Sequence, residues 1–230
     1  MISNYIICAT PRSGSNLLCE LLSSLGFSGR PEEHLWDPPG VDPEPLAERW
    51  PRVLQSGTGQ NGVFGVKLMW YQADRLERDL PEVLEMPGEP VARVLADALG
   101  DPKYVYLTRR DRLRQAISLV RAVQTEQWRS MDAIALPHYD AEAIADGLRF
   151  LSQDEANWEA FFDRSAVSPY RLTYEELESS PQDAITALLT YLGSGEPQPI
   201  PLSPSRHRRQ SDDLTEEWLR RFTSDREELQ

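Results

Sequence analysis

The residue types best suited to binding an anion stand in one short turn near the amino terminus. Its residues are Pro11, Arg12, Ser13, Gly14, Ser15 and Asn16. An apolar run over residues 2–9 predicts a strand before the turn, and leucines at helical spacing predict a helix over residues 14–25 after it. Unpaired N–H groups at a helix start, with the helix dipole, bind phosphate-like anions, and Arg12 adds a positive charge. The turn therefore predicts an anion site, with an ordinary strand–helix connection as the alternative.

The same turn does not have the pattern of a nucleoside-triphosphate P-loop. That pattern, G-x-x-x-x-G-K-[ST], needs a second glycine followed by a lysine and a hydroxyl that binds Mg²⁺. In this turn Gly14 is the one glycine, and no GK[ST] follows it. A small-molecule or nucleotide kinase-like enzyme that uses ATP and Mg²⁺ stays open as an alternative, with the missing lysine against it.

Composition and charge narrow the class of protein. A chain of 230 residues fits one α/β domain over 1–230 and can bury a substantial core. The net charge of −13 argues against a long nucleic acid as partner, and no apolar run approaches the roughly 20 residues that span a bilayer. The cysteines and histidines have no ligand spacing, so we expect no metal. The apolar start is too short for a signal peptide, so we expect a cytoplasmic protein.

Arginines gather in two places against this acidic background. One group follows residues 103–108, and the other lies within residues 206–209. Because a guanidinium binds phosphate through two parallel hydrogen bonds, both groups are candidate sites for a small polyanion. A solvated helix surface is the alternative. The first group is Arg109, Arg110, Arg112 and Arg114, and the second is Arg206, His207, Arg208 and Arg209.

Strand and helix patterns alternate along the chain. Further strands are predicted over residues 62–70, 103–108 and 170–173, and helices over 71–80, 90–99, 141–163, 181–192 and 214–222, with one more from after residue 111 to about 128. Residues 29–51 are rich in proline and predicted to be mostly loop. This order predicts an α/β, P-loop-like three-layer fold with a central mainly parallel sheet and helices on both faces. Ligands of such sheets bind beyond the carboxyl ends of the strands. Residues 12–16, 67–70 and 108–110 stand at the predicted strand ends, so we expect them to line one edge of the sheet.

Arg110 and Ser118 lie eight residues apart, at a strand end and two turns into the next helix, where such a pair can hold a second phosphate. Together with the turn, they resemble the sulfotransferases that use 3′-phosphoadenosine 5′-phosphosulfate (PAPS). In that superfamily a P-R/K-S-G-S/T loop binds the 5′-phosphosulfate, and an Arg and a Ser eight residues later bind the 3′-phosphate. Residues 172–177, LTYEEL, resemble its Y-E-D/E-L element, which implies that Tyr174 lies near the adenine.

Five motifs in order resemble one branch in particular, the bacterial trehalose 2-sulfotransferase type. They are PRSGSNLL (11–18), GRPEE (29–33), FGVKLMW (64–70), RRDR (109–112), and RQSD (209–212) before EW (217–218). The resemblance implies transfer of a sulfuryl group from PAPS, as co-substrate, to a hydroxyl of a sugar or another small-molecule acceptor. Adenosine 3′,5′-bisphosphate is then the product, and no metal is required. A homodimer is common in this branch.

The resemblance also implies roles for single residues. Arg12 and the amides of the turn would stabilise charge on the departing phosphate, and Glu33 matches the family's general base. His34 is the rival base, since imidazole titrates near neutral pH and other sulfotransferase branches use a histidine. Lys67 either approaches the transferring sulfonate or caps the sheet edge. The remaining implied contacts are Trp70 and Tyr71 on the acceptor or in the core, and Arg209 and Gln210 over the nucleotide phosphate.

The chain departs from this branch after the loop glutamate. His34 and Leu35 stand where an aromatic pair is common, so we expect a differently shaped acceptor pocket, which argues against trehalose as the acceptor. The five motifs do not cover residues 36–62, the segment before the second predicted strand. We expect this segment to contribute to acceptor selection. A third hypothesis is a catalytically inactive protein that binds adenosine 3′,5′-bisphosphate at the retained site.

Overall fold

Four parallel strands form the centre of the protein. The computed structural model describes residues 2–38, 40–126, 136–194 and 213–227, and within them the strand order is β2-β1-β3-β4. Ala9 lies opposite both Met69 and Leu107, so the carboxyl ends of the three neighbouring strands are level. The strands are β1 (Tyr5–Ala9), β2 (Gly65–Met69), β3 (Lys103–Thr108) and β4 (Tyr170–Thr173). Residues that follow these ends therefore meet at one edge of the sheet.

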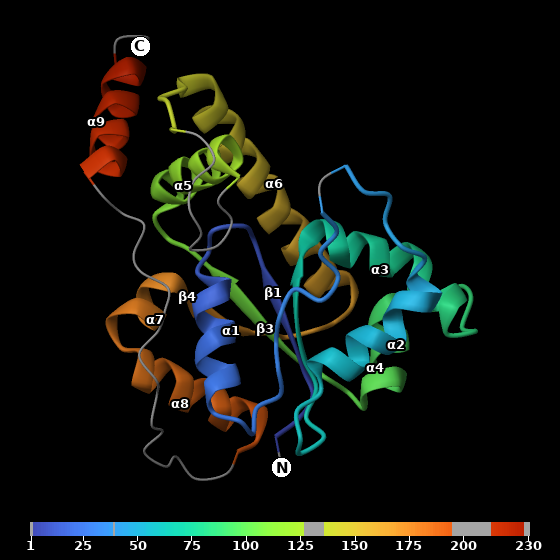
Figure 1. The fold of residues 1–230 in the computed structure, drawn as a ribbon. Coiled ribbons are helices and arrows are strands. Elements are labelled where there is room, and N and C mark those ends of the chain that lie inside the picture. The colour runs from blue at the N-terminus through green and yellow to red at the C-terminus, as the bar shows by residue number, and fades with distance from the viewer. Residues whose placement is uncertain (1, 39, 127–135, 195–212, 228–230) are drawn as a thin grey trace.

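Helices cover both faces of the sheet (Figure 1). The β1 side chains alternate, with Ile6 and Cys8 packed under one layer of helices and Tyr5, Ile7 and Ala9 under the other. The first layer is α2 (Leu46–Gly57), α3 (Trp70–Val83), α4 (Val91–Leu99) and part of α6 (Ala141–Arg164); the second is α1 (Ser15–Ser24), α7 (Tyr174–Ser179) and α8 (Pro181–Leu192). Beyond the carboxyl ends of the strands, α5 (Arg112–Thr125) packs on α6 and α9 (Asp213–Glu227). The predicted three-layer parallel fold is confirmed.

The carboxyl end of β1 is anchored by a tryptophan of α6. Trp158 is 1% exposed, and its Nε1–H donates to the Ala9 carbonyl at 3.1 Å. Its ring also packs edge-on against Trp70 at the start of α3, with centroids 5.3 Å apart. One indole thus joins three elements at the point where the chain leaves β1 and enters residues 11–16.

The prediction of mostly loop over residues 29–51 is wrong at its end, because α2 begins at Leu46 and includes Pro51. Pro51 is the sixth residue of this helix, and a proline inside a helix costs one amide hydrogen bond and causes a steric clash with the preceding turn. The side chains of Leu46, Trp50 and Val53 are buried against the sheet, and this apolar burial outweighs the loss. Proline content alone was therefore a poor guide to this segment.

Other differences concern element ends. The short helix α7 was not predicted, although Thr173 and Glu176 form a capping box at its start. The helix α5 ends at Thr125 and is followed by Glu126 in the left-handed region, so the prediction to about residue 128 is too long; residues 127 and 128 lie outside the described residues. The last helix extends to Glu227 instead of ending at residue 222, and the first two strands are shorter than predicted.

Replacing Trp158 by Phe should lower the free energy of unfolding by about 2 kcal/mol, because the Ala9 carbonyl loses its donor and a small cavity opens. Urea unfolding followed by circular dichroism measures this. Trp36→Phe is the matched control, since Trp36 is 45% exposed and its loss should change stability by less than about 0.5 kcal/mol. Equal effects of the two substitutions would contradict the anchoring role of Trp158.

Candidate active site

The first turn, residues 11–16, is shaped to receive an oxyanion. Gly14 has a φ of +86°, which favours glycine, and a Cβ at this position would lie 2.5 Å from Cδ2 of Tyr174. The Ser13 hydroxyl is buried, and none of the described residues hydrogen-bonds it. The residue that precedes α1, Gly14, has no side chain to cap the amides at the start of this helix. Because an oxyanion would satisfy these donors, the turn fits a phosphate or sulfate group.

Positive charge gathers at the first turn. The Nε–H of Arg12 donates to Ser118 Oγ at 2.9 Å, and Nη1 of Arg109 donates to the Arg12 carbonyl at 3.3 Å. Burial, with repulsion from Arg109 and Arg121, lowers the pKa of Arg12 to about 10. Arg12 still carries its charge at neutral pH, so an anion bound in the turn would relieve the repulsion between these guanidinium groups.

Tyr174 closes the turn from the side of β4. Its ring packs against Gly14 and lies under the Arg109 guanidinium, whose carbon is 4.5 Å from the ring centroid. The Nε–H of Arg109 is buried and finds no acceptor in the described part of the chain, and burial lowers the pKa of this group. Sequence reasoning assigned Arg109 no separate role, although its place directly after β3 was an available signal.

No hydrogen bond between described residues joins Arg110 to Ser118, the pair predicted to hold a second phosphate. Ser118 binds Arg12, whereas the Arg110 side chain is 67% exposed and has Nε 3.6 Å from Oε2 of Glu175. The Arg110 amide donates to the same carboxylate at 3.1 Å. Ser118 thus contacts the first turn through Arg12, whereas Arg110 contacts Glu175 at the start of α7. Arg209 and Gln210 lie outside the described residues.

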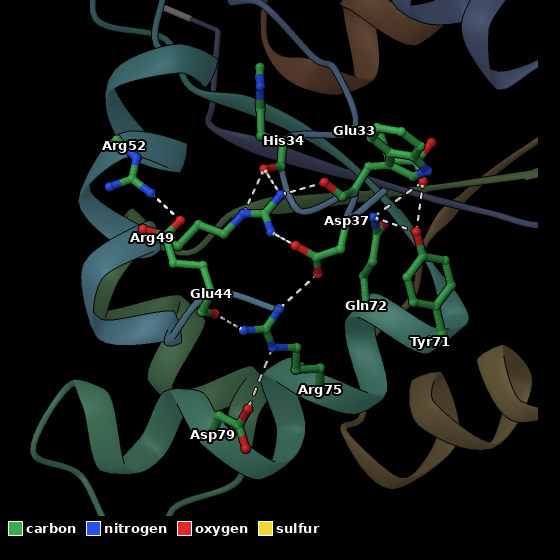
Figure 2. A network of polar contacts seen from close by, with 11 residues as sticks. Glu33, His34, Asp37, Glu44, Arg49, Arg52, Tyr71, Gln72, Arg75 and Asp79 are labelled. Atoms are coloured by element: carbon green, nitrogen blue, oxygen red, sulfur yellow. Dashed lines mark hydrogen bonds and ion pairs between the residues drawn. The ribbon is translucent and has the colours of Figure 1, made fainter. Parts of the chain in front are cut away.

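The other half of the site centres on Glu33. Lys67, on β2 and 1% exposed, has Nζ 3.0 Å from Oε2 of Glu33 and donates to Oδ1 of Asn16 at 2.6 Å. The second carboxylate oxygen of Glu33 accepts hydrogen bonds from Tyr71 OH at 3.1 Å and Gln72 Nε2 at 3.2 Å (Figure 2). Through Lys67, the first turn and Glu33 are therefore joined inside the protein.

Tyr71 and Gln72 fix one side of the Glu33 carboxylate from the first turn of α3. Burial, with the negative charge of Glu33, raises the pKa of Tyr71, so its hydroxyl stays protonated and donates. Gln72 is 1% exposed, and its Oε1 also accepts from the Met69 amide at 2.8 Å. Sequence reasoning missed Gln72; a polar side chain just beyond the end of β2 was the available signal.

His34 is next to Glu33 but is bonded differently. Its Nε2 lies 2.9 Å from the Arg30 carbonyl, so this nitrogen carries the proton and Nδ1 has the lone pair. Burial lowers the pKa of His34, which leaves the ring neutral at pH 7. Glu33 is thus the member of this pair that shares a contact with the first turn through Lys67.

Trp70 lies on the core side of the sheet edge. Its ring contacts Trp158, and the Arg164 guanidinium carbon lies 5.8 Å from its centroid. The adjacent Tyr71 is half exposed and contacts Glu33. Of the two aromatic residues that could meet an acceptor, Tyr71 is therefore the one bonded to the Glu33 carboxylate.

The described residues contain no group of three or more His, Cys, Asp or Glu side chains that could hold a metal ion. Across the same residues, none of the helices combines the length and apolar character needed to cross a membrane.

A parallel sheet with an anion-binding turn and a lysine-held carboxylate at one edge is suited to an enzyme that transfers an anionic group. The model of the Stf0 sulphotransferase family matches residues 4–52 and 41–225, so the chain belongs to this family and is a sulfotransferase. It is 29% identical over 258 aligned positions to the trehalose 2-sulfotransferases of Mycobacterium tuberculosis and Mycolicibacterium smegmatis. Each alignment covers 96% of this chain and 94% of the relative. The resemblance to PAPS-dependent sulfotransferases is thus confirmed at the level of the family.

The His34 ring should titrate with a midpoint below 6.5, because burial disfavours its charged form. Proton NMR of the imidazole signals over a pH series measures the midpoint, and the spectrum of His34→Gln identifies the signal that belongs to His34. A midpoint at or above 6.5 would show that the ring is not held in the buried, neutral state described above.

Proposed function

We propose that this sulfotransferase moves the sulfuryl group of PAPS to a hydroxyl group of a sugar and releases adenosine 3′,5′-bisphosphate. The family implies PAPS as the donor, and the names of the two mycobacterial relatives support a sugar acceptor. The observation that carries the proposal is the Lys67 bridge, which joins Asn16 of the first turn to Glu33. In-line transfer requires the donor-binding turn and the general base to be adjacent, and the Lys67 bridge supports that arrangement.

In this proposal the first turn binds the 5′-phosphosulfate end of the donor. PAPS supplies a sulfuryl group whose departure leaves negative charge on a phosphate oxygen. Arg12, the buried Ser13 hydroxyl and the amides that open α1 are the groups suited to stabilise that charge. Each such preorganised donor can lower the barrier by about 3 kcal/mol. Because guanidinium and amide groups provide the positive charge, the reaction as proposed needs no metal ion.

Glu33 is proposed as the general base that accepts the proton of the acceptor hydroxyl. Its carboxylate is held by Lys67 on one oxygen and by Tyr71 and Gln72 on the other, so it has a defined position at the sheet edge. General bases of this kind contribute about 10²- to 10⁴-fold to the rate. The Nδ1 lone pair keeps His34 as the second candidate for this role.

Replacing Glu33 by Gln should lower sulfuryl transfer at least about a hundredfold and leave binding of adenosine 3′,5′-bisphosphate within about twofold. His34→Gln is the matched control and should keep most of the activity. The assay incubates the enzyme with PAPS and a panel of sugars that includes trehalose, and detects sulfated products by mass spectrometry. Loss of activity only in His34→Gln would move the base to His34. Nucleotide binding without transfer to any acceptor would favour the inactive binding protein.

Gly14→Ala should weaken binding of adenosine 3′,5′-bisphosphate by about tenfold or more, because the added Cβ strikes Tyr174 inside the first turn. Gly26→Ala is the matched control: Gly26 also has a positive φ, +74°, but nothing lies within 4 Å of a Cβ there. Calorimetry with and without Mg²⁺, alongside ATP, measures both variants. A preference for ATP that requires Mg²⁺ would support the kinase-like alternative instead.

A further inference from the structure

Asp37, four residues after Glu33, binds guanidinium groups from two different helices (Figure 2). Its Oδ1 pairs with Nη1 of Arg49 on α2, and its Oδ2 lies 3.0 Å from Nη1 of Arg75 on α3. The three side chains are only 12–23% exposed, so the charges are screened less than those of surface ion pairs. We call Asp37, Arg49 and Arg75 the Asp37 clamp.

Arg49 carries the effect of the clamp to the backbone around Glu33. Its Nε and Nη2 donate to the His34 carbonyl at 3.2 and 2.9 Å, and Nη2 donates to the Trp36 carbonyl at 2.6 Å. The Trp36 amide in turn donates to the Glu33 carbonyl at 3.0 Å, which closes a turn over residues 33–36. One planar guanidinium, oriented by Asp37, therefore holds the turn that begins with Glu33.

Glu33 is also held from its other side. The carbonyl of Glu32 accepts from the Lys67 amide at 3.0 Å, which pairs this residue with the edge of β2. The backbone of Glu33 thus lies between a strand edge and a turn fixed by Arg49. Beyond Asp37, Arg75 also donates to the carbonyl of Glu44, so the same clamp holds both ends of residues 37–44.

We propose that Asp37 is a positioning residue for sulfuryl transfer, which acts through Arg49 to set the position of the Glu33 carboxylate relative to the acceptor hydroxyl. The inference rests on the proposed function, because it assigns Glu33 to the acceptor side. The contacts of the clamp involve α2, α3 and residues 34–44, and none of them includes the first turn. Its loss should therefore affect the acceptor and leave the nucleotide site intact.

The substitution Asp37→Asn tests this, because it keeps the shape of the side chain and removes the charge that orients both arginines. The two guanidinium groups would then repel each other and release the turn over residues 33–36. A displacement of about 1 Å at a reacting group costs on the order of a hundredfold in rate, so we expect kcat/KM for the acceptor to fall by 10- to 100-fold. The KM for PAPS and the Kd of adenosine 3′,5′-bisphosphate should stay within about twofold of the wild type.

Asp79→Asn is the matched control. Asp79 also pairs with Arg75, at 3.6 Å, but its side chain is 44% exposed and it contacts no other member of the clamp in the described residues. This variant should keep kcat/KM within about twofold. Hydrogen exchange of peptides that cover residues 30–37, followed by mass spectrometry, gives a readout that needs no acceptor. Exchange of the Trp36 amide should quicken in Asp37→Asn and not in Asp79→Asn.

Wild-type kcat/KM and wild-type exchange over residues 30–37 in Asp37→Asn would overturn the inference. So would an equal loss of acceptor turnover and nucleotide binding, which would indicate general destabilisation. If the wild-type enzyme transfers no sulfuryl group from PAPS, the proposed function fails. The exchange experiment then still decides whether Asp37 holds the turn, so the two failures are distinguishable.

Discussion

A single buried ammonium group joins the two halves of the site. Lys67 is 1% exposed and contacts both Asn16 and Glu33. Burying a charge without partners would destabilise the fold by several kcal/mol, so Lys67 requires both contacts. The side chain comes from the middle of β2, next to β1, and its position therefore follows from the parallel pairing of these strands. Because the first turn leaves the end of β1, strand register also sets its distance from Glu33.

The distribution of charge explains how an acidic protein can bind a polyanion. The chain has a net charge of −13, yet burial, with repulsion from the nearby Arg109 and Arg121, lowers the pKa of Arg12 to about 10. Such a concentration of positive charge in a partly buried place is unfavourable until an anion arrives. Next to Glu33, by contrast, Asp37 pairs with two arginines, and Arg49 and Arg75 hold nearby backbone carbonyls. Arginine thus has two separate tasks on the two sides of Lys67.

Sequence patterns predicted the fold well because the strands are short apolar runs that end in polar residues at one edge. Because the carboxyl ends of parallel strands lie at one edge of the sheet, the sequence also predicted that residues 12–16, 67–70 and 108–110 would meet. The structure brings them to one edge. Contacts between elements far apart in the chain could not be predicted in this way. The pairing of Asp37 with Arg49 depends on α2, a helix concealed by the prolines around it, and the bond between Gln72 and Glu33 depends on the start of α3. Ser118 pairs with Arg12 and not with Arg110 as predicted, and this pairing likewise depends on how α5 packs.

The most direct test of the account is a double-mutant cycle between Lys67 and Glu33, measured on kcat/KM for sulfuryl transfer. If Lys67 acts by holding Glu33, the variant Lys67→Met/Glu33→Gln should be no slower than Glu33→Gln alone, within about threefold. Losses that multiply in the double variant would contradict this. Lys67 would then act on the transferring group independently of Glu33, and the bridge between the two halves of the site would not be the interaction on which turnover depends.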